Sequence, residues 1–194
     1  MASRAPTVFT EREYLALEAA SDTKHEFVDG KIVSMAGASP AHNALAAKAT
    51  IALGIASRGK PCLPLSSDQR VHVPATGLYT YPDVVLACGE RRYKTDQPPS
   101  SLLNPTVIVE VTSDTTEDFD RGKKFLHYQS IAELRDYVIV SHLESRVDHY
   151  RRSENGEWIL ASHTTGEARI TLSGIEGSFS VADLYDGVDL REGS

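Results

Sequence analysis

"TVIVEVTS", residues 106–113, is a run of β-branched apolar residues interrupted by one acid, Glu110. Alternation along a strand places Val107, Val109 and Val111 on one face and Glu110 on the other. A carboxylate that leaves water costs several kcal/mol unless a cation or strong hydrogen-bond donors receive it. Two interpretations stay open on this stretch alone: an edge strand whose second face is wet, or a buried strand that carries a functional acid.

The segments around this strand predict both helices and strands. Thr10 and Glu13 form a capping box in "FTEREYLALEAA", the Asp29-Gly30 pair predicts a tight hairpin, and Ser39 caps a second helix. The other expected elements are strands at 61–66, 70–74, 81–88 and 134–141, a helix at 117–130, an antiparallel meander in the tail and a short capped helix at 180–187. This order predicts one mixed α/β or α+β domain over residues 1–194, with helices flanking a central sheet.

Composition narrows the class of protein. The chain has 194 residues, 41% of them hydrophobic and 24% charged, which is ordinary for a globular protein. Its net charge of −7 excludes a protein that merely coats nucleic acid, so any DNA contact needs a local basic surface or a bound metal. Cys62 and Cys88 lack metal-ligand spacing and fit reduced thiols in a cytoplasmic protein. No signal peptide and no membrane span are expected.

Polar residues at three further places could carry chemistry beside Glu110. Asp83 opens a strand directly after a proline, and the alternative is a turn carboxylate at the strand entry. In "DRGKKFLHY", Asp120, Lys124 and Tyr128 are spaced by four and share one helical face, although an exposed ion pair would give the same pattern.

The third place is Glu26, one turn of strand before the predicted hairpin. His25 and His42 could be metal ligands, although histidines at such positions are more often surface or cap residues. Two strand carboxylates, a lysine on the next helix and an early acid suit a hard divalent cation. Mg²⁺ uses one or two protein carboxylates together with water and phosphate oxygens. A nearby lysine can orient an attacking water and offset charge on a phosphoryl group.

The segments "HEFVDGKIVSMAGASPAHN", "TGLYTYPDVVLACGE" and "LLNPTVIVEVTSDTTEDFDRGKKFLHYQSI" closely resemble the Uma-type putative restriction endonuclease family, a branch of the PD-(D/E)XK nuclease superfamily. The resemblance extends from "EYLALE" to "VADLYDG". It implies a restriction-endonuclease-like central mixed sheet flanked by helices, with a C-terminal antiparallel meander. It also implies Mg²⁺, or Mn²⁺, as cofactor and cleavage to 5′-phosphate and 3′-hydroxyl products.

Carried over by residue, the resemblance makes Asp83 the first metal ligand and Glu110 the second. The superfamily places a lysine two residues after the glutamate, where this chain has Thr112. Lys124 in "DRGKK" then supplies the lysine from the following helix, and Glu26 matches the early acidic position. We expect Glu26 to approach the cation through water rather than directly.

The first functional hypothesis is a metal-dependent endonuclease that hydrolyses phosphodiester bonds of DNA, with Arg121, Lys123 and Tyr128 as candidate substrate-binding residues. Other basic clusters that could contact DNA, or be ordinary solvated surface, are Arg91, Arg92 and Lys94, and Arg151 and Arg152. The alternative is a non-cleaving nucleic-acid- or protein-binding module that keeps the fold, which Thr112 and the acidic charge favour. A phosphohydrolase for small phosphate esters is disfavoured because the chain has no P-loop. A homodimer is expected, because duplex cleavage needs two active sites.

Overall fold

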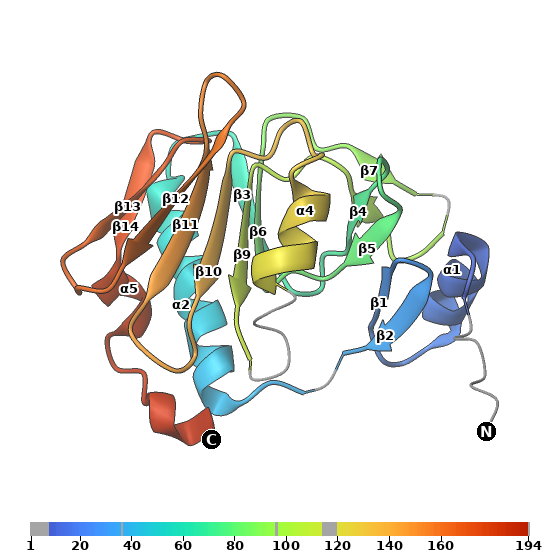
Figure 1. Ribbon diagram of the computed structural model, residues 1–194, viewed down its shortest axis with the longest axis horizontal. Helices are drawn as coiled ribbons and strands as arrows, with labels where there is room; N and C mark the ends of the chain where they lie inside the picture. The colour runs from blue at the N-terminus through green and yellow to red at the C-terminus, as the bar shows by residue number, and fades with distance from the viewer. Residues whose placement is uncertain (1–7, 36, 96, 114–119, 194) are drawn as a thin grey trace.

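A computed structural model describes residues 8–35, 37–95, 97–113 and 120–193. These residues form two six-stranded sheets, one two-stranded hairpin and several helices (Figure 1). The architecture is mixed α+β, as the sequence predicts.

The central sheet has the order β12-β11-β10-β9-β6-β3. Strand β9 is Val107–Val111, the core of the stretch around Glu110, and all five of its residues are buried. It pairs in parallel with β10 and antiparallel with β6. The edge-strand interpretation is therefore wrong, because β9 has a hydrogen-bonded strand on each side. The other strands of this sheet are β3 (Cys62–Ser66), β6 (Val84–Cys88), β10 (Asp136–Val140), β11 (Val147–Arg152) and β12 (Trp158–His163).

Both faces of the central sheet are covered. Helix α2 (Pro40–Ala56) lies across one face, where Leu45 and Leu53 pack with Val109 and Val138. On the other face, Ile108 packs with apolar side chains of α4 and the smaller sheet. Figure 1 shows these two elements on that side of β9. Apolar residues therefore occupy both sides of β9, and Glu110 shares the Ile108 face because side chains alternate along a strand.

The smaller sheet has the order β2-β1-β5-β4-β8-β7. Its first hairpin turns at Asp29 and Gly30, whose φ angles of 49° and 75° are those of a tight turn, which confirms the expected hairpin. Helix α1 (Glu11–Ala20) begins with the predicted Thr10–Glu13 capping box. The strands of this sheet are β1 (His25–Val28), β2 (Lys31–Ser34), β4 (Val71–Val73), β5 (Leu78–Thr80), β7 (Tyr93–Lys94) and β8 (Ser101–Leu102).

The tail only partly follows the expected meander. Strands β11 and β12 extend the central sheet antiparallel, but β13 (Arg169–Leu172) leaves it and pairs with β14 (Gly177–Ser180). Helix α5 (Val181–Tyr185) follows with Ser180 as its cap, and a 3₁₀ turn, η2, spans Leu190–Gly193. Ile170 and Phe179 explain the departure, because the hairpin buries them against α2.

The helix expected at 117–130 is shorter and less regular. A π-helical turn, η1, spans Asp120–Lys124 and passes directly into α4, Phe125–Tyr128. Residues 117–119 lie outside the described part of the chain. π-Helical turns are rare and frequently occur at functional sites.

The two cysteines are not reduced thiols: Cys62 and Cys88 form a disulfide. They lie directly opposite each other in the antiparallel β3–β6 pair, with Cα atoms 4.0 Å apart. The expectation rested on sequence spacing, which does not show that two strands will bring these residues together. Within the described ranges, no helix has the length and hydropathy to cross a membrane.

Close packing of the C-terminal hairpin on α2 depends on Gly177. A Cβ added there would clash with the backbone carbonyl group of Ala56 at the end of α2. We expect Gly177→Ala to lower the free energy of unfolding by roughly 1–3 kcal/mol, measured by urea denaturation. Gly166→Ala is the control, because its Cβ would lie 3.7 Å from the Ala182 Cβ, an ordinary contact. Equal stability of the two variants would contradict this packing argument.

Candidate active site

Glu110 and Lys124 form a buried ion pair at the centre of the molecule. Lys124 Nζ lies 3.2 Å from Glu110 Oε1, and the two residues are 5% and 3% exposed. The strand supplies the acid and the π-helical turn supplies the ammonium. Asp120, Lys124 and Tyr128, which the sequence places on one helical face, are all buried on the inner side of η1 and α4, next to β9.

Two further carboxylates surround the same ammonium. Lys124 Nζ lies 3.1 Å from Glu26 Oε1 and 3.3 Å from Asp120 Oδ1. Glu26 Oε1 also accepts hydrogen bonds from the Thr80 hydroxyl and from the Tyr81 backbone N–H. Glu26 therefore reaches the cluster from β1, and its Oε1 holds Lys124 in place.

Tyr128 fixes the other partner of the pair. Its hydroxyl donates to Glu110 Oε1 at 2.9 Å and lies 3.4 Å from the Thr80 hydroxyl. Because Tyr128 is completely buried, it supports Glu110 from inside the protein and does not face a substrate. Its expected place among the substrate-contacting residues does not agree with this position.

The electrostatics of the cluster follow from burial and from its excess of acids. Burial raises the pKa of Glu110 well above its usual range, and although Lys124 opposes that change, Asp120, Asp83 and Glu26 add to it. Burial alone would lower the pKa of Lys124, but Glu110 and Glu26, with Tyr128 and Asp120, outweigh it and raise that pKa. Lys124 is consequently an ammonium at neutral pH and cannot accept a proton from water.

Asp83 lies beside this cluster at the start of β6. Val84, the next residue, pairs with Val109, so Asp83 lies near Glu110 where the two strands end, and its charge acts on Glu110. Asp83 Oδ2 accepts a hydrogen bond from the Val111 backbone N–H at 2.7 Å. The Asp83 side chain is 15% exposed, so solvent reaches the cluster from this side.

Comparison with known proteins places this chain in a family. Residues 12–184 match the model of the Uma2 family, described as putative restriction endonuclease. The chain belongs to this family. Two Synechocystis relatives are both described as uncharacterized proteins: slr1290 is 33% identical over 176 residues, covering 91% of this chain and 90% of the relative. The second, sll1609, is 31% identical over 166 residues, covering 86% and 93%.

A solved structure shares the fold of this Uma2 chain. It is the crystal structure of a putative nuclease belonging to DUF820 from Anabaena variabilis, with a TM-score of 0.74 and 17% identity. The match covers 91% of this chain and 97% of that one. At this level of identity the likeness establishes the fold, and the roles of individual residues must be argued from their geometry.

Other residues that the sequence singled out lie at or near the buried cluster. Arg121 pairs with Asp148 on β11, and Lys123 is exposed. Thr112 is buried and exchanges hydrogen bonds with His142, so a side chain at that position is directed to the segment after β10 rather than to Glu110.

Sequence reasoning missed Thr80 and gave little weight to His42. Thr80 is a polar residue in the apolar run before Pro82, which is a weak signal. His42 Nε2 lies 3.4 Å from Asp83 Oδ2. His42 is three residues after the helix cap Ser39, where a capping box would have Glu or Gln, and this substitution was the available signal.

Asp83 and Glu110 are the residues that could hold a divalent cation. Each has one oxygen engaged by the protein, Oδ2 and Oε1 respectively. Among described groups, Asp83 Oδ1 and Glu110 Oε2 have no hydrogen-bond partner. The described residues contain no group of three or more His, Cys, Asp or Glu side chains arranged as a metal cage. This donor set fits Mg²⁺, which takes one or two carboxylates and completes its shell with water and substrate oxygens.

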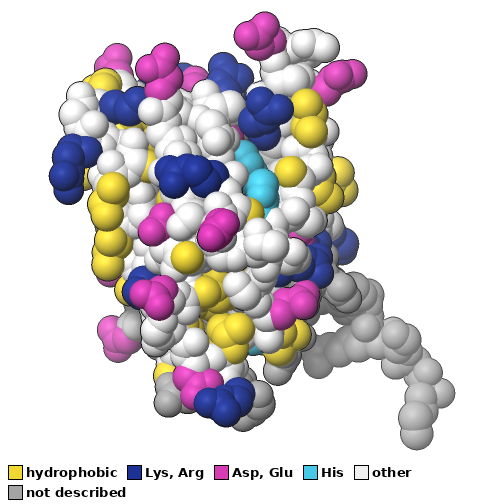
Figure 2. All heavy atoms as spheres, turned by 90° about the vertical axis from the view of Figure 1, so that its left-hand side faces the viewer, with side chains coloured by type: hydrophobic (Ala, Val, Ile, Leu, Met, Phe, Trp, Pro, Cys, Tyr) yellow, Lys and Arg dark blue, Asp and Glu magenta, His cyan; other side chains and the backbone are white. Residues whose placement is uncertain are grey.

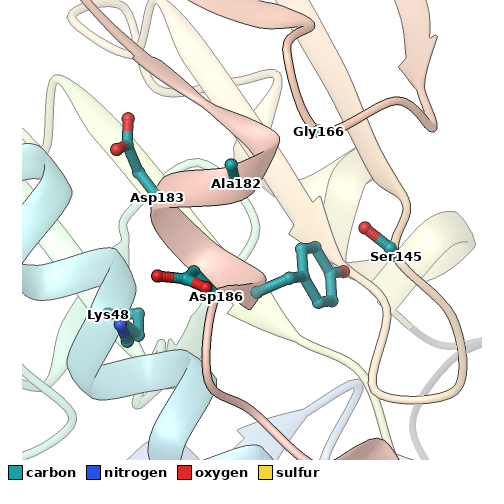
Figure 3. Close-up of a pocket in the computed structure, with 7 residues that line it drawn as sticks. Lys48, Ser145, Gly166, Ala182, Asp183 and Asp186 are labelled. Carbon is teal, nitrogen blue, oxygen red and sulfur yellow. The ribbon is translucent and has the colours of Figure 1, made fainter.

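A pocket of about 470 Å³ lies on the other side of the central sheet, between α2 and α5 (Figure 3). Asp183 and Asp186 lie near Lys48 there. Asp183 completes the capping box of α5, and the Tyr185 hydroxyl donates to the Ser141 and Arg146 carbonyls. These two side chains are used by the fold itself, so the pocket does not compete with the buried cluster as a candidate site.

Proposed function

We propose that this Uma2 chain is a metal-dependent endonuclease that hydrolyses phosphodiester bonds of DNA. The observation that carries the proposal is the buried Glu110–Lys124 pair, with Asp83 at the adjacent strand end. An ion pair this deep is weak evidence for stability, because desolvation cancels much of the attraction. Three carboxylates face one ammonium and Asp83 lies beside them, which leaves a negative excess that a bound cation would compensate.

Each residue has a distinct task in this proposal. Asp83 and Glu110 bind Mg²⁺ or Mn²⁺, which when bound stabilises charge on phosphate oxygens and increases the acidity of water. Lys124 remains an ammonium and offsets negative charge developing on the phosphoryl group. Glu26 and Asp120 hold that ammonium in position, and the scissile phosphate approaches from the partly exposed Asp83 side.

Contacts to DNA come from outside the cluster. Lys123 is exposed next to the site, and we propose it as a phosphate contact, with Arg121 beside it. Figure 2 shows the face over β12–β14 and α5, where basic and acidic side chains are interspersed. Such a mixed surface offers no continuous basic track for DNA on that face.

The proposal also covers domain organisation, assembly and cellular location. Residues 1–194 act as one domain, and two copies pair so that both strands of a duplex meet an active site. The proposed DNA substrate favours a cytoplasmic location. The cysteines do not support it, because Cys62 and Cys88 form a disulfide and are not reduced thiols.

The test is a cleavage assay with Mg²⁺ or Mn²⁺ on supercoiled and single-stranded DNA. We expect the wild-type chain to nick DNA. In Asp83→Asn the cleavage rate should be lower by about 100-fold or more, because the amide is a poor cation ligand. Asp186→Asn is the matched control, an exposed aspartate at the far pocket, and should cleave normally. Cleavage in neither metal would favour the alternative, a non-cleaving binding module, which the absence of a strand lysine at Thr112 supports.

A further inference from the structure

His42 lies where the central helix meets the proposed metal site. Ser39 caps α2, Pro40 occupies its first turn, and the Ser39 hydroxyl accepts the His42 backbone N–H at 3.2 Å. This geometry directs the imidazole toward the start of β6, where Nε2 lies 3.4 Å from Asp83 Oδ2. Both side chains are mostly buried, with 16% and 15% exposed.

The Asp83 carboxylate is approached on one oxygen by two groups. Oδ2 accepts the Val111 backbone N–H at 2.7 Å, and His42 Nε2 lies near the same oxygen. The first group belongs to β9 and the second to α2, so the carboxylate is held between the sheet and the helix. Its orientation is thereby set, and the second oxygen, Oδ1, is the one left for a cation.

The polar surroundings of the imidazole point to this role. The polar groups that act on it are the Asp83 carboxylate and the backbone of Val111, with the Asp120 carboxylate acting through its charge alone. Nδ1 is buried, and no described group forms a hydrogen bond with it. A histidine that only filled space could be replaced by an apolar side chain without this desolvation cost. The contact with Asp83 is therefore the feature that the imidazole provides.

We propose that His42 is a positioning residue that orients the Asp83 carboxylate for cation binding. The inference rests on the proposed function. A side chain that fixes a ligating carboxylate acts through the ligand, and its loss typically weakens metal affinity by about 10- to 100-fold. The positive end of the α2 dipole, at the turn that carries His42, also attracts the Asp83 carboxylate.

The experiment measures Mn²⁺ affinity of the intact chain by calorimetry, independently of cleavage. We expect His42→Leu, which keeps the bulk but removes the donor, to raise the Kd about 10- to 100-fold. His42→Gln should bind within a few-fold of wild type, because its amide N–H can replace Nε2. His127→Leu is the control, since His127 is similarly buried but faces Asp29 at 3.8 Å.

Each result has a definite meaning. Wild-type affinity in His42→Leu would overturn the positioning role and leave the proposed function intact. Equal loss in His42→Gln and His42→Leu would also overturn it, since a direct metal ligand would not be replaced by an amide. Absence of Mn²⁺ binding by the wild-type chain would remove the proposed function and this inference together. If His42→Leu does not fold, His42→Asn replaces it, because the shorter amide cannot reach Asp83.

Discussion

Lys124→Ala should lower the rate of DNA cleavage by roughly 100- to 1,000-fold while the chain stays folded. The ammonium lies 3.2 Å from Glu110 Oε1 and is held there by Glu26 and Asp120, so alanine removes the only cation that the described residues place in this cluster. Lys124→Arg should fail as well, because a planar guanidinium cannot replace a compact ammonium among three carboxylates. The measurement is single-turnover nicking with Mg²⁺.

Lys123 provides the matched control, because it is adjacent in sequence and exposed. Lys123→Ala should only weaken DNA binding, with a smaller dependence of the affinity on salt concentration. Equal loss of cleavage in the two alanine variants would indicate general electrostatics. Full activity of Lys124→Ala would exclude the helical lysine from the mechanism.

The same substitution should change stability in a pH-dependent way. Without the ammonium, Glu110 remains buried among acids, and its folded-state pKa, already raised by burial, rises further. The folded state then binds more protons than the unfolded state, so stability falls as pH increases above the ordinary glutamate pKa. Breaking a buried pair costs about 3–5 kcal/mol, and we expect a loss of that order at pH 8 that shrinks toward pH 5.

Local patterns predicted much of the fold and the chemical nature of the site. The capping box at Thr10 and the hairpin at Asp29 depend on neighbouring residues and are confirmed. The proximity of Glu110 and Lys124 was expected, because an acid in an apolar strand needs a cation and the next helix carries a lysine on a polar face. The mixed α+β class followed from the order of these elements.

Contacts between distant segments account for what the sequence did not reveal. Strand pairing decides whether β9 is central or at an edge, and the same pairing joins Cys62 to Cys88. Neither the central position of β9 nor the disulfide can be read from the hydrophobic periodicity of a single segment. Thr80 was missed and His42 was given little weight for the same reason: each is unremarkable in its own segment and gains a role only when another element brings Glu26 or Asp83 beside it.

Glu110→Gln should abolish cleavage and, at the same time, raise stability at pH 8. The amide keeps the shape of the side chain, and its oxygen can still accept from Tyr128 and Lys124. The substitution removes a buried carboxyl group whose pKa is raised by burial and by neighbouring carboxylates. Glu26 and Asp120 still neutralise Lys124, so we expect a gain of about 1–2 kcal/mol in the free energy of unfolding.

The pH dependence separates this gain from an ordinary packing effect. At pH 4, just below the ordinary glutamate pKa, Glu110 of the wild-type chain is mostly protonated in both the folded and the unfolded state, so the advantage of Glu110→Gln should be small there and grow as pH rises. Asp148 is the control of opposite sign: burial would raise its pKa, but bonds to Arg146, Ser162 and Arg121 lower it to about 2. Asp148→Asn should therefore destabilise the chain at neutral pH, and the loss should disappear as pH falls through that value. Urea denaturation from pH 4 to 8 measures the gain in Glu110→Gln, and extending the Asp148→Asn series toward pH 2 follows the loss. A destabilised Glu110→Gln at pH 8, or one that still cleaves DNA, would mean that Glu110 serves the fold and not a catalytic cation.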